Sequence, residues 1–120
     1  LVQSTDLFPT LIEIAGGDPT KLTQLDGVSL VSTIKNNTEL QRDEPLIGYR
    51  AYNDSYATVR LEDWKLIAFR SGKTELYNIA NDIGETTDLA TRHPLKVKQL
   101  VDELVQWEQN VGVAEYSGFQ

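Results

Sequence analysis

The chain holds few side chains that could carry out catalysis. It has no cysteine, so it can form no disulfide, thiolate metal site or cysteine nucleophile. His93 is its single histidine, and it precedes Pro94 at an expected helix start, where a helix cap or a solvated side chain is far more usual than a general base. A Ser-His-Asp triad or a pair of histidine metal ligands therefore cannot be built elsewhere in the chain. No glycine-rich phosphate loop follows a predicted strand. We expect no catalytic residue in this chain.

An acidic segment, residues 81–88, is the nearest approach to a metal site. Its sequence is NDIGETTD, and clustered carboxylates in turns suit calcium. The spacing does not match an EF-hand loop, however, and Asn-Asp-x-Gly is typical of a turn leading into a helix. We interpret the segment as structural and expect no metal site and no bound cofactor.

The overall charge excludes some classes of partner. The formal net charge is −7 and the isoelectric point is about 4.6, with 40% hydrophobic and 24% charged residues. An acidic surface repels phosphate groups, which argues against nucleic acid as a partner. The apolar runs are too short to span a bilayer. The composition is that of an ordinary globular domain.

Two helices are predicted at the two ends of the chain. Near the N-terminus, Asp6 is expected to cap a short helix in which Leu7, Leu11 and Ile14 recur at helical spacing, before two glycines end it. A polar loop over residues 18–29 and a brief helical turn over residues 30–35 should follow. A long amphipathic helix is predicted to begin at Pro94, with His93 as a possible cap, and to end near residues 110–112.

Between them the hydrophobic period changes from 3.6 to about 2. Strands are predicted over residues 46–52, 55–61, 64–69 and 74–79. Because the connecting turns are only two to four residues long, these strands must pair antiparallel with their neighbours. The fold class is therefore α+β: a four-stranded antiparallel sheet with the long C-terminal helix on one face and a short N-terminal helix. The second face also carries apolar and aromatic groups, so something outside this chain could cover it.

The residues alone leave two hypotheses open. The chain could be a binding or interaction module, or it could be a non-catalytic part of an enzyme whose reactive groups lie upstream. The start at Leu1, without an initiator methionine, suggests a fragment of a larger protein.

Four phrases in a fixed order resemble the type I, formylglycine-dependent sulfatases of the alkaline phosphatase superfamily. Residues 6–16 (DLFPTLIEIAG) resemble a D-[LI]-x-P-T-L-L-x-L-A-G helix, and residues 25–30 (LDGVSL) resemble the L-D-G-x-S-L loop that follows it. Residues 59–67 (VRLEDWKLI) resemble a V-R-x-G-D-W-K-L-I hairpin, with Glu62 where glycine is more usual. Residues 75–90 (ELYNIANDIGETTDLA) are similar to E-L-Y-D-L-x-x-D-P-G-E-T-x-N-L-A, with Ile83 in place of proline. Together the phrases span nearly the whole chain.

The resemblance implies hydrolysis of sulfate esters by the parent enzyme. In that family a formylglycine, made from the Cys or Ser of a C/S-x-P/A-x-R motif, attacks sulfur beside a calcium ion. Those groups belong to a large N-terminal catalytic domain, which would be the partner of this chain within one polypeptide. The substrate would be a sulfated small molecule or glycan, and the family's habit is export to the periplasm or the outside of the cell.

The nucleophile motif itself is absent from this chain. The nearest approach is the stretch from Ser55 to Arg60, where the arginine falls one position too late. That stretch also lies in a predicted strand. We therefore expect residues 1–120 to form the C-terminal subdomain of a sulfatase, a fragment without its N-terminal catalytic α/β domain and catalytically silent alone.

One place is predicted to contact substrate. The resemblance puts the start of the sheet near the mouth of the active-site cleft, where Arg50, Tyr52, Asn53 and Asp54 offer polar and aromatic groups suited to a sugar or aryl ring. Period-2 alternation sends Trp64 and Lys65 to opposite faces, so we interpret Trp64 as packed and Lys65 as a solvated or paired charge. The alternatives are the C-terminal part of a phosphonate or phosphate ester hydrolase of the same superfamily, or a stand-alone interaction module.

Overall fold

The computed structural model describes all residues except 41, 43, 51–54 and 114–120. The chain divides into two compact units, an N-terminal unit (Leu1–Asp43) and a C-terminal unit (Glu44–Gln120), and each is described by itself. Within the described parts of both units, no helix has the length and apolar character needed to cross a membrane.

The N-terminal unit consists of short helices joined by loops. A 3₁₀ turn, η1 (Ser4–Asp6), leads into α1 (Leu7–Ile14), and η2 (Pro19–Lys21) and α2 (Val31–Asn36) follow. The predicted N-terminal helix and the brief helical turn are both confirmed. Gly16, with a φ of +85°, takes the left-handed conformation just beyond the end of α1, as the paired glycines predicted.

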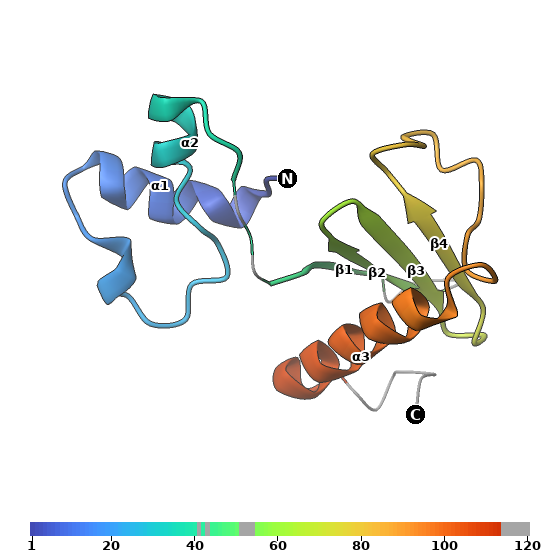
Figure 1. Ribbon diagram of the computed structural model, residues 1–120. Helices are drawn as coiled ribbons and strands as arrows, with labels where there is room; N and C mark the ends of the chain where they lie inside the picture. Colours follow the sequence, from blue (N-terminus) through green and yellow to red (C-terminus); the bar gives the residue numbers. More distant parts are fainter. Residues whose placement is uncertain (41, 43, 51–54, 114–120) are drawn as a thin grey trace. The chain divides into compact units, whose positions relative to one another are not determined.

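The C-terminal unit is the predicted sheet with its helix. Strands β1 (Leu46–Arg50), β2 (Tyr56–Leu61), β3 (Trp64–Phe69) and β4 (Thr74–Asn78) pair antiparallel in that order, and α3 (Pro94–Val111) lies across one face (Figure 1). The α+β prediction is confirmed. Short turns force this meander because a parallel pairing would need a long crossover.

The core lies between α3 and the sheet face that it covers. Val59, Leu66 and Leu76 are cross-strand neighbours on that face and are fully buried, as are Leu100 and Leu104 of α3. The predicted apolar stripe of α3 therefore packs on the sheet. Partly buried side chains extend this core at its margins, among them Tyr49, Trp64, Val97 and Trp107.

The packing of Trp64 confirms its interpretation as a core residue, and Lys65 on the opposite face is a paired charge. Its Nζ lies 2.7 Å from both carboxylate oxygens of Glu85. The turn between β2 and β3 is made by Glu62 and Asp63, and Glu62 has a φ of +53°. This is a left-handed conformation that glycine adopts most easily, which explains why glycine is more usual at that place in the resembling motif.

The two predicted helix caps are wrong in detail. Asp6 stands at the N-cap position of α1, but its side chain makes no bond to the first turn of that helix. Its carboxylate instead accepts from the N–H groups of Gln3 and Val28, because a loop folds back over it. His93 occupies the N-cap position of α3 without a side-chain cap, and its ring lies 5.1 Å from that of Trp64.

Candidate functional site

Of the predicted substrate-contacting residues, the structure describes Arg50. Arg50 is the last residue of β1 and is exposed. Tyr52, Asn53 and Asp54 lie outside the described residues. Their part in the predicted site is therefore still a prediction, and Arg50 is the member whose surroundings can be examined.

Arg50 begins a row of side chains that crosses three strands. Its cross-strand partner on β2 is Tyr56, and Tyr56 in turn faces Phe69 on β3. The Arg50 guanidinium carbon lies 5.6 Å from the centre of the Tyr56 ring, and the Tyr56 and Phe69 ring centres are 5.8 Å apart. These are cation–π and tilted aromatic contacts. Lys73 closes the row, with its Nζ 5.5 Å from the centre of the Phe69 ring.

The row lies on the sheet face opposite α3. Ala57 and Ala68, the residues next to Tyr56 and Phe69, are buried in the core under α3, and successive side chains in a strand point to opposite faces. We name this set, Arg50, Tyr56, Phe69 and Lys73, the cation–aromatic row. Sequence reasoning missed Tyr56 and Phe69 as site residues, because only the strand register brings them beside Arg50.

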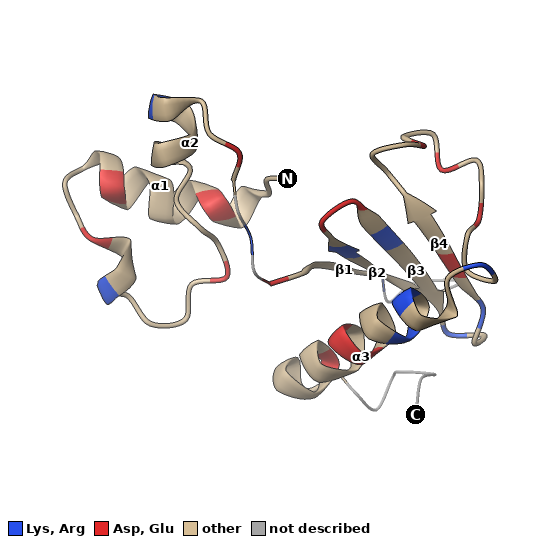
Figure 2. Ribbon diagram, viewed as in Figure 1, with Lys and Arg blue, Asp and Glu red and all other residues tan. Residues whose placement is uncertain are grey.

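The charges on this face are unevenly compensated. Lys65 is paired with Glu85, and Lys73 with Glu75. Among the ion pairs of the described residues, none involves Arg50 or Arg60, the other arginine on this face. Basic bands on β2 and β3 and an acidic band on β4 show this pattern (Figure 2). An anion approaching the row would therefore meet a guanidinium without a carboxylate partner among the described residues.

The Glu75 side of this face also holds a tyrosine with a shifted pKa. Burial raises the pKa of Tyr77 to about 12, and the hydrogen bond from its hydroxyl to Glu75, 3.0 Å long, acts in the same direction. Tyr77 is thus a neutral hydrogen-bond donor at any physiological pH, and the structure gives it no other role.

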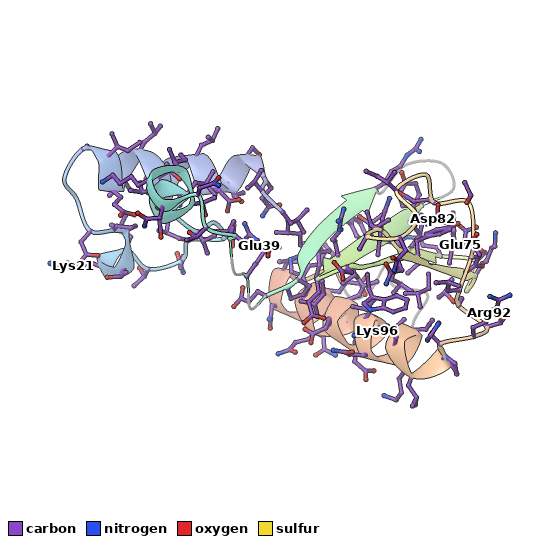
Figure 3. All side chains as sticks on the ribbon, turned by 45° about the horizontal axis from the view of Figure 1, so that its top comes forward. Lys21, Glu39, Glu75, Asp82, Arg92 and Lys96 are labelled. Atoms are coloured by element: carbon purple, nitrogen blue, oxygen red, sulfur yellow. The ribbon has the colours of Figure 1, made fainter. Side chains whose placement is uncertain are left out.

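The acidic segment 81–88 is organised as a set of loop caps. Asp82 accepts from the backbone N–H groups of Thr86 and Thr87, both at 2.8 Å, and the Thr87 bond is the main cause that lowers its pKa. Asp88 accepts from Leu76 and Ala90 and so ties the loop to β4. Figure 3 labels Asp82 and Glu75 in this region. Within the described residues no group of three or more metal-ligating side chains lies close enough to hold an ion.

A second cluster, in the N-terminal unit, surrounds Asp6. Its side chain is fully buried and accepts from Gln3 N (2.8 Å), Val28 N (2.9 Å) and Arg42 Nη2 (2.6 and 2.7 Å). Burial acts to raise its pKa, but the Arg42 bond and the two backbone bonds outweigh burial, so the pKa is lowered. The cluster ties the start of the unit to Arg42, near the end of the unit. No sequence signal pointed to Arg42, which lies 36 residues from Asp6 in a polar loop.

One cavity in the C-terminal unit is also a candidate site. It has a volume of about 180 Å³ and lies between the start of β1 and α3. Its wall comprises Glu44, Pro45, Ile47, Glu103, Gln106, Trp107 and Asn110. The two carboxylates would repel a sulfate, so this cavity does not fit the substrate that the resemblance implies.

Two proteins similar to this chain in sequence are named as sulfatases. A sulfatase of Formosa agariphila is 29% identical over 109 residues, which cover 78% of this chain and 19% of that protein. Mouse arylsulfatase J is 26% identical over 162 aligned positions, covering 97% of this chain and 27% of that protein. No family model matches the chain.

The solved structures agree in fold. The crystal structure of Ps i-CgsB superposes with a TM-score of 0.78 at 26% identity, over 98% of this chain and 26% of that one, and the protein was also solved in complex with k-i-k-neocarrahexaose. The chain is similar in sequence to sulfatases and shares their fold over nearly its whole length. A phosphonate monoester hydrolase of Agrobacterium radiobacter shares the fold, with a TM-score of 0.60 at 22% identity.

The sulfatase relatives are much longer than this chain. It spans 19% and 27% of the length of the two relatives and 26% of the Ps i-CgsB chain. The chain therefore corresponds in length to a segment of these sulfatases, and the cation–aromatic row is a surface of that segment.

Proposed function

We propose that the chain is the C-terminal part of a sulfuric ester hydrolase, where it completes the fold and shapes the substrate entrance. The observation that carries this proposal is the match of nearly the whole chain, 97%, to only 27% of arylsulfatase J. We expect no catalytic residue in a segment of this size, so the catalytic residues are proposed to lie in another domain of the same polypeptide.

The exposed side of α1 supports a partner domain. Leu7, Leu11 and Ile14 are 57%, 63% and 65% exposed, although their spacing places them on one stripe of the helix. Phe8 beside them is 58% exposed. Contiguous apolar surface of this kind marks an interaction site. The N-terminal catalytic domain of the parent would cover it.

The parent is proposed to use calcium and formylglycine, as the sulfatase family implies. The residues of this chain do not fit either group. No described cluster can hold a metal, and the chain has neither a cysteine nor a serine in a C/S-x-P/A-x-R motif that could become formylglycine. We therefore derive no catalytic step here, and we propose that the 120-residue chain is inactive by itself.

The substrate is proposed to be a sulfated glycan or small molecule, contacted by Arg50 together with Tyr52, Asn53 and Asp54. The exposed guanidinium of Arg50 suits a sulfate oxygen, since its planar fork of donors matches oxyanions. The relative Ps i-CgsB, solved with k-i-k-neocarrahexaose, supports a carbohydrate rather than a simple aryl ester.

The second candidate is the C-terminal part of a phosphonate or phosphate ester hydrolase, which the shared fold of the Agrobacterium enzyme supports. The deciding experiment reads the coding sequence upstream of Leu1 and assays the encoded polypeptide on a sulfate ester and a phosphonate monoester. A C/S-x-P/A-x-R motif with faster sulfate release supports the sulfatase. Faster phosphonate cleavage supports the second candidate, and a start codon directly before Leu1 would indicate a stand-alone module.

A further inference from the structure

The cation–aromatic row combines contacts that stabilise the sheet with charged side chains that stay exposed to solvent. Cross-strand aromatic and cation–π pairs each stabilise a sheet modestly. Such pairs do not require the side chains to remain open to solvent, yet Arg50 is exposed and the Lys73 side chain is 63% exposed. Among the described residues, no carboxylate forms an ion pair with Arg50.

The row presents two kinds of group side by side. Tyr56 and Phe69 are adjacent, half-buried rings with Arg50 and Lys73 over them, and the rest of their exposed surface suits the apolar C–H face of a sugar. Arg50 is already held over Tyr56, so less side-chain entropy is lost when it binds an oxyanion. A cation at the edge of an aromatic surface therefore fits a ring that carries a negative substituent.

The charge of the chain makes this local arrangement selective. With a net charge of −7, the surface as a whole repels anions, and the ring pair beside Arg50 is a local exception, whereas the charge of Lys73 is compensated by Glu75. A neutral sugar would gain no attraction between opposite charges from Arg50, and an isolated sulfate would gain no stacking contact from the rings. The complementary ligand is a single unit with both features.

We propose that the cation–aromatic row binds a sulfated sugar ring, with the ring over Tyr56 and Phe69 and the sulfate group on Arg50. This inference rests on the proposed function and deepens it, because it assigns the sulfated glycan a contact surface made by residues of β1, β2 and β3. The sulfate bound there is held and is not cleaved, since this chain has no nucleophile for it. The row thus recognises a sulfated sugar unit of a substrate chain.

The test is a titration of the 120-residue chain, followed by backbone NMR shifts. Three probes are used: a galactose disaccharide with one sulfate ester, the same disaccharide without sulfate, and inorganic sulfate. The sulfated disaccharide should shift Arg50, Tyr56 and Phe69, and its affinity should fall as salt is added. The other two probes should bind at least about fivefold more weakly, since each lacks one contact.

Two matched variants separate local contact from net charge. Arg50→Gln should weaken binding about fivefold, the effect of losing one exposed ion pair. Arg92→Gln removes the same charge beside His93, whose ring packs on Trp64, a residue of the sheet face that α3 covers and not of the face that carries the row. It should leave the affinity unchanged. Tyr56→Val removes the ring but leaves a residue with high strand propensity, and it should also weaken binding while the remaining shifts confirm the fold.

Several results would overturn the inference. They are equal effects of Arg50→Gln and Arg92→Gln, equal binding of the two disaccharides, equal binding of inorganic sulfate, or no shift in the row. The proposed function fails by a different readout, the absence of sulfate release by the longer polypeptide. Sulfate release by the longer polypeptide, with no binding of the sulfated disaccharide at the row, would reject this inference alone. Binding at the row without sulfate release would reject the proposed function alone.

Discussion

Replacing Asp6 by Asn should unfold the N-terminal unit selectively. The Asp6 side chain is fully buried and is the acceptor for two backbone N–H groups and for Arg42. Asn keeps the shape but loses the charge and turns one acceptor into a donor. Removing one partner of a buried ion pair costs about 3–5 kcal/mol, because the other charge is left buried without compensation. Whole domains are stable by only about 5–15 kcal/mol.

The two units can be followed by separate signals. Both tryptophans and all five tyrosines lie in the C-terminal unit, so intrinsic fluorescence reports on that unit alone. Amide hydrogen exchange in α1 and α2 reports on the N-terminal unit. We expect Asp6→Asn to speed exchange in the helices of the N-terminal unit by two orders of magnitude or more, from about 3 kcal/mol. The fluorescence transition should not move.

The matched control is Asp18→Asn in the same unit. Asp18 is exposed, accepts from Thr20 at the start of η2 and lies 3.6 Å from Lys21, so its substitution should leave exchange in α1 and α2 nearly unchanged. The double variant Asp6→Asn with Arg42→Met should recover part of the loss, since it removes the stranded charge. Equal exchange in Asp6→Asn and Asp18→Asn would refute the reasoning.

Acid should act on the same cluster. The folded pKa of Asp6 is lowered, so its contribution to stability is present above the usual aspartate value of 3.8 and is lost as the pH falls through the lower folded pKa. The N-terminal helices should therefore lose protection against exchange below about pH 4 in the parent chain, but not further in the Asp6→Asn variant.

Three further predictions concern single positions. Gly27→Ala should destabilise the N-terminal unit by about 2 kcal/mol or more, because the new Cβ would collide with the backbone oxygen of Thr5. Gly84→Ala is the control, because its Cβ would meet nothing nearer than 3.4 Å. Equal urea midpoints of unfolding in the two variants would contradict this prediction. Glu62→Gly should stabilise the C-terminal unit by about 0.5–1 kcal/mol, because φ is +53° there, and a lower melting temperature would contradict it. Raising the pH from about 10 to 12 should destabilise the sheet, because the Tyr77 pKa is raised to about 12 in the folded state and its contribution to stability is complete only below the ordinary value of 10.0. Glu75→Gln should lower the Tyr77 pKa, as the absorbance of tyrosinate would report. An unchanged titration in that variant would speak against the Glu75 hydrogen bond.

Periodicity was sufficient to predict the sheet and its helix. Alternation in residues 55–61 and 64–69 placed Val59 and Leu66 on one face, and the turns at residues 62–63 and 70–73 were short enough to force antiparallel pairing. Local rules of this kind depend only on neighbours in sequence. They also predicted the loop role of the 81–88 segment, where Asp82 and Asp88 accept from nearby backbone groups.

Contacts between distant residues could not be predicted in the same way. The side chain of Asp6 turned from its own helix toward Val28 and Arg42, because a buried carboxylate gains more from an arginine and two N–H groups than from one cap. The position of Tyr56 beside Phe69 depends on strand register, which hydrophobic alternation leaves open along the strand.

The most direct test of the central claim compares sulfate release by two purified polypeptides. One is the complete polypeptide that contains this segment, and the other is the 120-residue chain alone, both on a sulfated disaccharide. The account predicts sulfate release by the complete polypeptide and none by the 120-residue chain, even with calcium added. Turnover by the 120-residue chain, or no release by the complete polypeptide, would contradict it.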